Sequence, residues 1–268
     1  MKGILMRNYL TILHQKMIQA KCARDMRPYK ESRSGRCFII GNGPSLKIAD
    51  LELLQNEVTF ASNRIYGLFD RTSWRPTYYA SQDDGVILEI KDKLLDVSRQ
   101  VQHMFLNGNV MRVYSAKLKQ QENVSFMYIR PTAEGKKSMD IDVPNGIHNG
   151  INISYTMIEL AIYMGFTEIY LLGIDHNYVT KINQQGETVL DGNSSANYFA
   201  GIAPLKYVAK VKEKDLTHLM DASTAAYQNA KTYADAHGIK IYNATRGGHL
   251  EVFERVNFDD VVKGAYES

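Results

Sequence analysis

A glycine-rich turn early in the chain has the residue types of a phosphate-binding site. The apolar run CFII at 37–40 leads directly into Gly41, Asn42, Gly43, Pro44 and Ser45. Glycines at the end of a strand let backbone N–H groups approach an anion, and proline suits the first turn of a helix. The asparagine amide and the serine hydroxyl would supply further donors. The turn predicts a nucleotide site, and the alternative is a purely structural turn.

This turn departs from the two common nucleotide-binding motifs. Leu46 stands where G-x-G-x-x-G requires its third glycine, and the chain contains neither GKS nor GKT. Asn63 and Arg64 follow the run VTFAS at 58–62, where a dinucleotide-binding unit often carries an acid for the ribose. An amide and a cation favour contact with a phosphate or a base edge. The sequence therefore argues against an NAD dehydrogenase and against a P-loop enzyme.

Two histidines are candidate general bases. Asp175 and His176 directly follow the run EIYLLGI at 168–174. A histidine beside a carboxylate can accept a proton near neutral pH. His218 lies where a long polar segment would rejoin the domain and is the second candidate. The alternative for a lone histidine is a structural role.

Further candidates for anion binding lie elsewhere. His148, Asn149 and Gly150 precede the strongest helical pattern, and the dipole at that helix end favours an anion. Arg246 follows the run KIYNA at 240–244, where it would meet a phosphate.

Asp83 and Asp84 follow the run TYYAS at 77–81. Paired carboxylates can hold Mg²⁺ between phosphates, but they can also cap the next helix, and we favour capping. Cys22 and Cys37 lack the spacing of a metal site. The chain is therefore expected to require no metal or other cofactor.

Composition excludes several classes of protein. The chain has 268 residues, 44% of them hydrophobic and 23% charged, which is enough for one large domain with an insertion. A net charge of +3 does not indicate nucleic-acid binding. Two cysteines fit a cytoplasmic protein, and neither a membrane-spanning run nor a signal peptide is expected.

Apolar runs separated by helical patterns predict the fold. The runs are continuous rather than alternating, which is typical of strands buried on both faces of a parallel sheet. They lie at 37–40, 58–62, 77–81, 103–107, 125–129, 168–173 and 240–244. Helices are expected from Asn149 or Asn152 to Gly165 and over about 219–236. Helix, glycine and strand in repetition predict an α/β doubly wound, mostly parallel sheet.

Two segments interrupt this pattern. Residues 177–215 are polar and rich in Gly, Asn and Ser, and they follow a strand end where ligands bind, so they predict a lid inserted in a domain at 35–268. Residues 1–34 form a basic segment with apolar residues at helical spacing. Such a helix binds an anionic surface, here the inner face of the membrane, or packs on its own domain or a neighbouring subunit of a homo-oligomer.

Three motifs in combination resemble a known family. FIIGNGPSL at 38–46, FASNRIY at 60–66 and HNGINISYTMIELAIYMGFTEIYLLGIDHNY at 148–178 are similar to a bacterial family with a Rossmann-like domain, which resembles an archaeal 6-hydroxymethylpterin diphosphokinase. The same motifs resemble bacterial sialyltransferases that use CMP-sialic acid and the motility accessory factors that glycosylate flagellin. The resemblance covers roughly residues 36–262.

This resemblance implies roles for individual residues. It implies that Asn42, Asn63 and the segment from His148 to Gly150 contact the nucleotide, and that Tyr178 binds its phosphate. Asn197 stands where the sialyltransferases carry a catalytic lid histidine. Their acceptor chemistry is therefore not implied, and a base would have to be His176 or His218.

Three functions remain open at this point. The first is a glycosyltransferase that moves a sugar from a nucleotide-activated, CMP-linked donor to a glycan or surface-polysaccharide acceptor. The second is an ATP-dependent diphosphokinase for a pterin alcohol, which would need Mg²⁺, with Asp83, Asp84 and Asp175 as the candidate ligands. The third is a nucleotide-binding protein without catalysis, which the missing lid histidine suggests.

Overall fold

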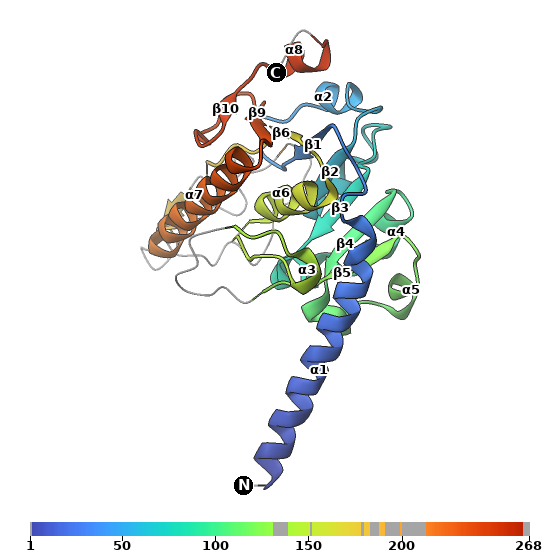
Figure 1. Cartoon of the computed structure of the whole chain (residues 1–268). Coiled ribbons are helices and arrows are strands. Elements are labelled where there is room, and N and C mark those ends of the chain that lie inside the picture. The colour runs from blue at the N-terminus through green and yellow to red at the C-terminus, as the bar shows by residue number, and fades with distance from the viewer. Residues whose placement is uncertain are drawn as a thin grey trace.

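The computed structural model describes residues 2–130, 139–150, 152–177, 180–182, 188–190, 199 and 213–264. Within them the main sheet has eight strands, all parallel, in the order β10-β9-β6-β1-β2-β3-β4-β5 (Figure 1). The strands are β1 (Arg36–Ile40), β2 (Thr59–Ser62), β3 (Tyr78–Ser81), β4 (His103–Asn107), β5 (Val124–Met127), β6 (Glu168–Leu172), β9 (Lys240–Asn243) and β10 (Glu254–Arg255). The predicted doubly wound α/β fold is confirmed, and each predicted run forms a strand. The two-residue β10 was not predicted.

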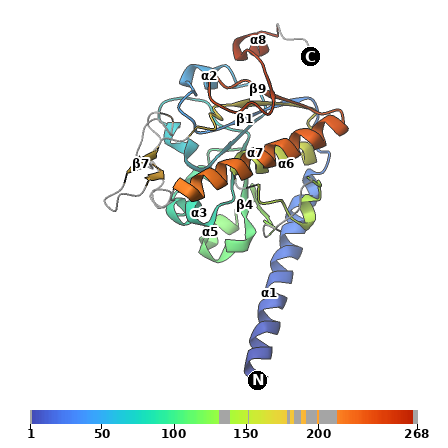
Figure 2. The same cartoon turned by 90° about the vertical axis from the view of Figure 1, so that its left-hand side faces the viewer.

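The helices form a layer on each side of this sheet. α6 (Ile153–Met164) and α7 (Glu213–Ala236) cover one face, as Figure 2 shows. The short helices cover the other: α2 (Ile48–Glu52), α3 (Asp84–Ile90), α4 (Leu94–Ser98), α5 (Ala116–Lys119) and α8 (Phe258–Val262). Turns of 3-10 helix span Arg27–Tyr29, Asn63–Leu68, Gly108–Val113 and Val143–Asn145.

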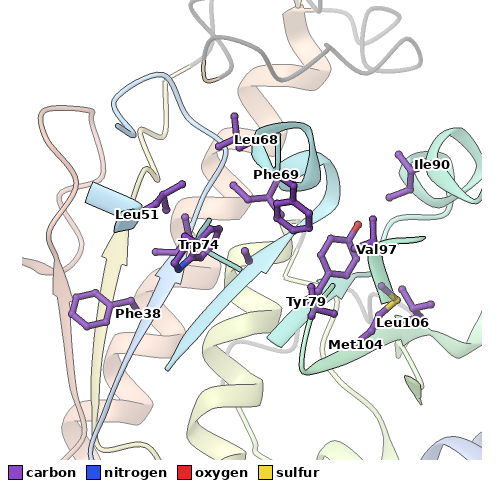
Figure 3. Packing of buried hydrophobic residues seen from close by; sticks show 14 of the residues in the cluster. Phe38, Leu51, Leu68, Phe69, Trp74, Tyr79, Ile90, Val97, Met104 and Leu106 are labelled. Carbon is purple, nitrogen blue, oxygen red and sulfur yellow. The ribbon is translucent and has the colours of Figure 1, made fainter. Parts of the chain in front are cut away.

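Alternation along the strands divides the core in two. In β1, Phe38 and Ile40 face the short helices, whereas Cys37 and Ile39 face α6 and α7, and all four are fully buried. Successive side chains of a strand point to opposite faces, so a continuous apolar run serves both layers. Figure 3 shows part of the first cluster, including the side chains of Trp74 and Leu51.

The order of the strands reverses direction between β1 and β6. From β1 the chain proceeds outward through β2, β3, β4 and β5, and it then returns to the other side of β1 with β6. Loops leaving neighbouring strands in opposite directions open a crevice at the carboxyl edge of the sheet, where ligands of such folds bind. The fold thus locates the site between the turn after β1 and the loop after β6.

Helix α6 leads the chain back to β6, and a capping residue lies at each of its ends. Asn152 accepts a hydrogen bond from the N–H of Tyr155 at 2.8 Å, and Gly165 ends the helix with a φ of 98°. A left-handed residue at this position satisfies the last carbonyls of a helix, and glycine adopts it without strain. Of the two predicted starts, Asn152 is therefore the cap.

The end of α1 (Lys2–Met26) packs against the domain. Cys22 and Met26 are buried, and the Asp25 carboxylate accepts a hydrogen bond from the N–H of Phe126 in the edge strand β5. The first half of the helix extends away from the domain in both views (Figures 1 and 2). None of the described helices combines the length and the apolar composition needed to cross a membrane.

The predicted lid lies mostly outside the described residues. Its described part includes two strands, β7 (Thr180–Ile182) and β8 (Thr188–Leu190), which pair antiparallel. These strands were not expected in a segment predicted to be irregular. Phe199 is buried, and its N–H donates to the carbonyl of Asn42 at 2.8 Å. This contact connects the segment directly to the turn after β1.

Candidate functional site

Glycines bring the turn after β1 against the loop after β6. A Cβ on Gly41 would lie 2.2 Å from the carbonyl oxygen of Gly173, and one on Gly43 would lie 1.9 Å from Oδ2 of Asp175. Both distances are far below van der Waals contact with backbone or with a held carboxylate. The two glycines are therefore required by the close approach of the two loops.

A hydrogen bond closes this contact across the crevice. The Ser45 hydroxyl donates to Oδ2 of Asp175 at 2.8 Å, and the Ser45 N–H lies 3.4 Å from the same oxygen. Burial raises the pKa of the Asp175 carboxyl above its ordinary value, although the bonds from Ser45 oppose that shift. Sequence analysis predicted both residues at the site, and the structure brings them together.

The same contacts change the interpretation of the turn. The N–H of Gly41 donates to the Leu172 carbonyl and that of Gly43 to the Gly173 carbonyl, so these donors face the loop after β6. These two hydrogen bonds count against a phosphate cradle made of the Gly41 and Gly43 donors, and the nucleotide contact of the turn stays a prediction. Pro44 also does not start a helix, because α2 begins at Ile48, after Ser45 has been drawn toward β6.

Asn42 presents an acceptor rather than a donor to the crevice. Its Nδ2 donates to the carbonyl of Ser62 at 3.2 Å, and a carbonyl can only accept, which fixes the orientation of the amide. Its Oδ1 is buried and has no hydrogen-bond partner among the described residues, and the same holds for the Ser62 hydroxyl. Buried polar atoms normally have partners, so these two indicate a ligand that supplies them.

Asn63 continues this edge of the site with a left-handed backbone. Its φ is 53°, its carbonyl accepts from the Tyr79 hydroxyl at 2.5 Å, and its Oδ1 accepts from the Ser81 hydroxyl at 3.0 Å. Asparagine tolerates this conformation better than most residues. The neighbouring Arg64 forms an ion pair with Glu89 at 2.7 Å. The predicted cation therefore already has a carboxylate beside it.

His176 follows β6 and is strained. Its φ of 50° is rare for a residue other than glycine, and such strain is concentrated at functional sites. Its Nε2 lies 2.8 Å from the Thr224 hydroxyl of α7, and its ring meets that of Tyr227 edge to face. Burial, and then the nearby His249, lower the pKa of His176 below its ordinary value of 6.5. The ring is neutral at neutral pH.

The hydrogen bonds of Thr224 determine which nitrogen of His176 can act. The Thr224 hydroxyl has one proton, which it donates to the carbonyl of Met220 at 2.9 Å. With that proton on the Met220 carbonyl, the hydroxyl accepts at 2.8 Å from the Nε2–H tautomer of His176. In this tautomer Nδ1 carries the lone pair and is the proton acceptor.

The segment before α6 contains a charged cluster that sequence analysis did not predict. The N–H of His148 donates to Oε2 of Glu159 at 3.1 Å, and its Nδ1 lies 3.4 Å from Oε1. Glu159 is fully buried, and burial raises its pKa while His148 opposes the shift. Arg130 and Asp140 lie on the other side of the ring, each 3.2 Å from its Nε2. The signal for this cluster in the sequence was the single acid, Glu159, within the apolar run of α6.

Gly150 and Asn152 connect this cluster to α7. A Cβ on Gly150 would lie 2.1 Å from the ring of Tyr155, so the chain passes closely over the first turn of α6. The amide of Asn152 donates to the Ser223 hydroxyl at 2.6 Å, and its Oδ1 accepts from the Tyr227 hydroxyl at 3.0 Å. Ser223 and Tyr227 flank the residue that holds His176, so the start of α6 lies beside this histidine. Asn149 is exposed.

Arg246 is held by two carboxylates. Its guanidinium donates to both oxygens of Asp50, at 3.1 and 3.3 Å, and to both oxygens of Asp259, at 2.7 and 3.1 Å. Its charge is thus neutralised at the α2 and α8 side of the domain. This arrangement gives Arg246 a structural role and counts against the predicted contact with a phosphate.

The remaining predicted residues are exposed, have other partners or lie outside the described residues. His218 is exposed on α7, and no described residue forms a hydrogen bond or ion pair with it. Asp83 caps α3 by accepting from the N–H of Val86 at 2.9 Å, so the capping alternative is confirmed for it. Asp84 accepts from the Asn107 amide at 2.9 Å. Tyr178 and Asn197 lie outside the described residues.

The three carboxylates considered for Mg²⁺ do not meet. Asp83 and Asp84 follow β3, whereas Asp175 follows β6, and strands β1 and β2 lie between. In the described part of the chain, no group of three or more His, Cys, Asp and Glu side chains is arranged to hold a metal ion. The proposed set of ligands is therefore not assembled.

Comparison with known proteins identifies the family of the chain. A family model described as 6-hydroxymethylpterin diphosphokinase MptE-like matches residues 8–181, which include the turn after β1, the start of α6 and His176. The chain belongs to the MptE-like family. The predicted resemblance is confirmed. No curated protein sequence matches this MptE-like chain significantly.

Solved structures are similar to the chain at low sequence identity. The MAf glycosyltransferase from Magnetospirillum magneticum AMB-1 has a TM-score of 0.54 and 15% identity over 94% of this chain, which spans 41% of that protein. The sialyltransferase CstII from Campylobacter jejuni, in complex with CMP-3FNeuAc, has a TM-score of 0.41 and 14% identity, covering 82% of this chain and 85% of its own. The complex of the same sialyltransferase with cytidine-5'-monophosphate has a TM-score of 0.45 and 15% identity. The first match shows a common fold.

Proposed function

We propose that the chain is a glycosyltransferase that moves a sugar from a CMP-linked donor to a hydroxyl of a glycan or surface polysaccharide. The observation that carries the proposal is the state of His176. Its Nε2–H is bound to Thr224, its pKa is lowered, and it lies at the carboxyl end of β6, where folds of this type bind ligands. A neutral imidazole at such a crevice suits the deprotonation of an attacking hydroxyl.

In the proposed reaction, Nδ1 of His176 takes the proton of the acceptor hydroxyl. The hydroxyl oxygen forms a bond to the anomeric carbon, the bond from that carbon to the phosphate oxygen breaks, and CMP leaves with the electron pair. The positive end of the α6 dipole would stabilise the charge on the phosphate. Asn42 Oδ1 would accept from a hydroxyl or amino group of the nucleoside. The motif resemblance to CMP-using enzymes and the fold shared with a glycosyltransferase support this assignment.

The family description favours a second candidate, ATP-dependent pyrophosphoryl transfer to a pterin alcohol. That reaction depends on Mg²⁺ to neutralise the phosphates. The separation of Asp83 and Asp84 from Asp175 counts against it. The proposed sugar transfer requires no such ion. Nucleotide binding without catalysis is the third candidate, and it predicts the same ligand without turnover.

A thermal-shift panel of the full chain with CMP, CDP, UDP, GDP and ATP, each with and without Mg²⁺, tests the proposal. CMP at a hundred times its Kd should raise the melting temperature by roughly 5–10 °C without metal. Stabilisation by ATP only, and only with Mg²⁺, would refute the sugar-transfer proposal and favour the diphosphokinase. Stabilisation by CMP with no release of CMP from any CMP-sugar would favour the non-catalytic alternative.

A pH profile tests the base. Because the pKa of His176 lies below 6.5, the base is neutral and active at pH values where an ordinary histidine is protonated. Release of CMP should therefore persist below pH 6.5 and fall only as the pH drops through the lowered pKa. The same acid limb in a His176→Gln variant would remove His176 from this role.

A further inference from the structure

The outer half of α1 carries an apolar stripe that is separate from the core. Leu10, Leu13 and Met17 are 58%, 44% and 65% exposed. Their spacing of three and then four residues places them on one side of the helix. In both views this part of the helix extends beyond the domain (Figures 1 and 2). The stripe is therefore an unpartnered surface of the described chain.

This stripe faces away from the side of α1 that packs on the domain. Nine residues, about two and a half turns, separate Leu13 from Cys22 and likewise Met17 from Met26, so each pair lies on opposite sides of the helix. Cys22 and Met26 are buried in the domain. The polar Gln15, seven residues before Cys22, continues the side that faces the domain. The stripe thus does not extend the packing surface of the core.

The charge of α1 indicates what can cover the stripe. The sequence from Lys2 to Arg24 contains five cations and no acid. Arg24 lies seven residues after Met17 and so extends the stripe with a positive charge, and it is exposed. Asp25, the first acid, is already paired with Lys21 at 2.7 Å. Two copies of this helix would repel each other, whereas anionic lipid headgroups would attract it.

We propose that α1 binds the surface of an anionic phospholipid bilayer, with Leu10, Leu13 and Met17 in the interface and its cations at the headgroups. Apolar burial and electrostatic attraction are the two contributions that hold such helices in the interface. Because the domain packs on the opposite side of α1, it leaves the stripe accessible to a flat surface. The proposal is independent of the reaction at the crevice.

Co-sedimentation of the full chain with vesicles tests the proposal. Vesicles of equal parts phosphatidylglycerol and phosphatidylcholine should bind the protein, and vesicles of phosphatidylcholine alone should bind it weakly. The double variant Leu13→Gln with Met17→Gln should lower the partition coefficient by about tenfold or more, because it removes apolar area without changing charge. Lys16→Gln with Arg24→Gln should weaken binding by a similar factor, and raising the salt from about 0.1 to 0.5 M should do the same.

A matched control carries Ile12→Gln with Leu88→Gln. Ile12 and Leu88 are each 52% exposed, but Ile12 lies off the stripe and Leu88 lies in α3. This variant should bind the vesicles like the wild type. An equal loss of vesicle binding in the stripe variant (Leu13→Gln with Met17→Gln) and in this control would overturn the proposal. Equal binding of the wild type to neutral and anionic vesicles would overturn it as well. Analytical ultracentrifugation gives a further test. If the wild type is a dimer, and the stripe variant is a monomer that still binds vesicles, then the stripe binds a second copy of the chain and the proposal is overturned. All variants should keep the wild-type melting temperature because the residues are exposed.

Discussion

The left-handed backbone of His176 allows strain and chemistry to be separated by two substitutions. At a φ of 50° a side chain costs about 1–2 kcal/mol, a cost that glycine does not have. Glycine also gives the unfolded chain more freedom, which costs the folded state about 0.4–1 kcal/mol. His176→Gly and His176→Ala lose the same bond to Thr224 and the same contact with Tyr227. The glycine variant should therefore be the more stable of the two by about 1 kcal/mol.

Urea denaturation followed by circular dichroism measures this difference, which corresponds to roughly 2–4 °C in melting temperature for a chain of this size. Glu31 provides the matched control, because its φ is 48° and its exposed side chain lies in the segment before β1. Glu31→Gly should likewise exceed Glu31→Ala in stability by about 1 kcal/mol, since the backbone conformation is the same.

Turnover separates the two positions. If His176 is the base, both of its variants should lose on the order of 10²–10⁴ in kcat for release of CMP from the donor, and both Glu31 variants should retain wild-type activity. At position 176 the more stable variant would then be as inactive as the other. Equal stability of glycine and alanine at 176, with the expected difference at 31, would refute the reasoning about strain. Wild-type kcat in either His176 variant would refute its role as base.

Contacts of Asn42, Arg246 and His103 give three more tests. Asn42→Ala should weaken nucleotide binding, measured by calorimetry, by about tenfold with little loss of stability, and an unchanged Kd would exclude Oδ1 as a ligand contact. Arg246→Gln should lower the free energy of unfolding, measured by urea denaturation, by about 2–4 kcal/mol because it leaves the buried Asp50 carboxylate unpaired. Adding Asp50→Asn should restore part of this stability. Weaker nucleotide binding at unchanged stability would instead assign Arg246 to a phosphate. Burial lowers the pKa of His103 from 6.5 to about 4, so its contribution to stability is complete above pH 6.5 and about 3 kcal/mol is lost as the pH falls to 4. His103→Gln should flatten this loss in urea denaturation measured across that pH range, and an unchanged loss would refute the assignment to His103.

The fold could be predicted from the sequence because its signals are local. Runs such as EIYLLG are apolar on both faces, so each strand was identifiable without knowledge of its neighbours. The end of α6 at Gly165 was likewise evident from residue type, and Asn152 was one of the two predicted starts. The two-residue β10 was missed because its pairing with β9 depends on tertiary contacts and not on an apolar pattern.

The site could be predicted only in part because hydrogen-bond partners are set by the tertiary structure. Residue types and strand ends placed Asn42, Asp175 and His176 at one crevice. They could not show that Arg246 would meet Asp50 and Asp259, since these carboxylates are 196 and 13 residues away along the chain. The contact of His176 with α7 was hidden for the same reason, and it determines which nitrogen accepts the proton.

The turn after β1 differs from a P-loop in how its glycines are used, which bears on how the proposed nucleotide would be bound. In a P-loop the glycines let backbone donors face the phosphates. Here the donors of Gly41 and Gly43 face the loop after β6, and each glycine is needed because that loop lies where a Cβ would be. The turn therefore holds two loops together, and Asn42 and His176 each present an acceptor at the crevice. Such a site would recognise hydroxyl and amino groups of the nucleoside and acceptor, and the charge of the phosphate would fall to the dipole of α6.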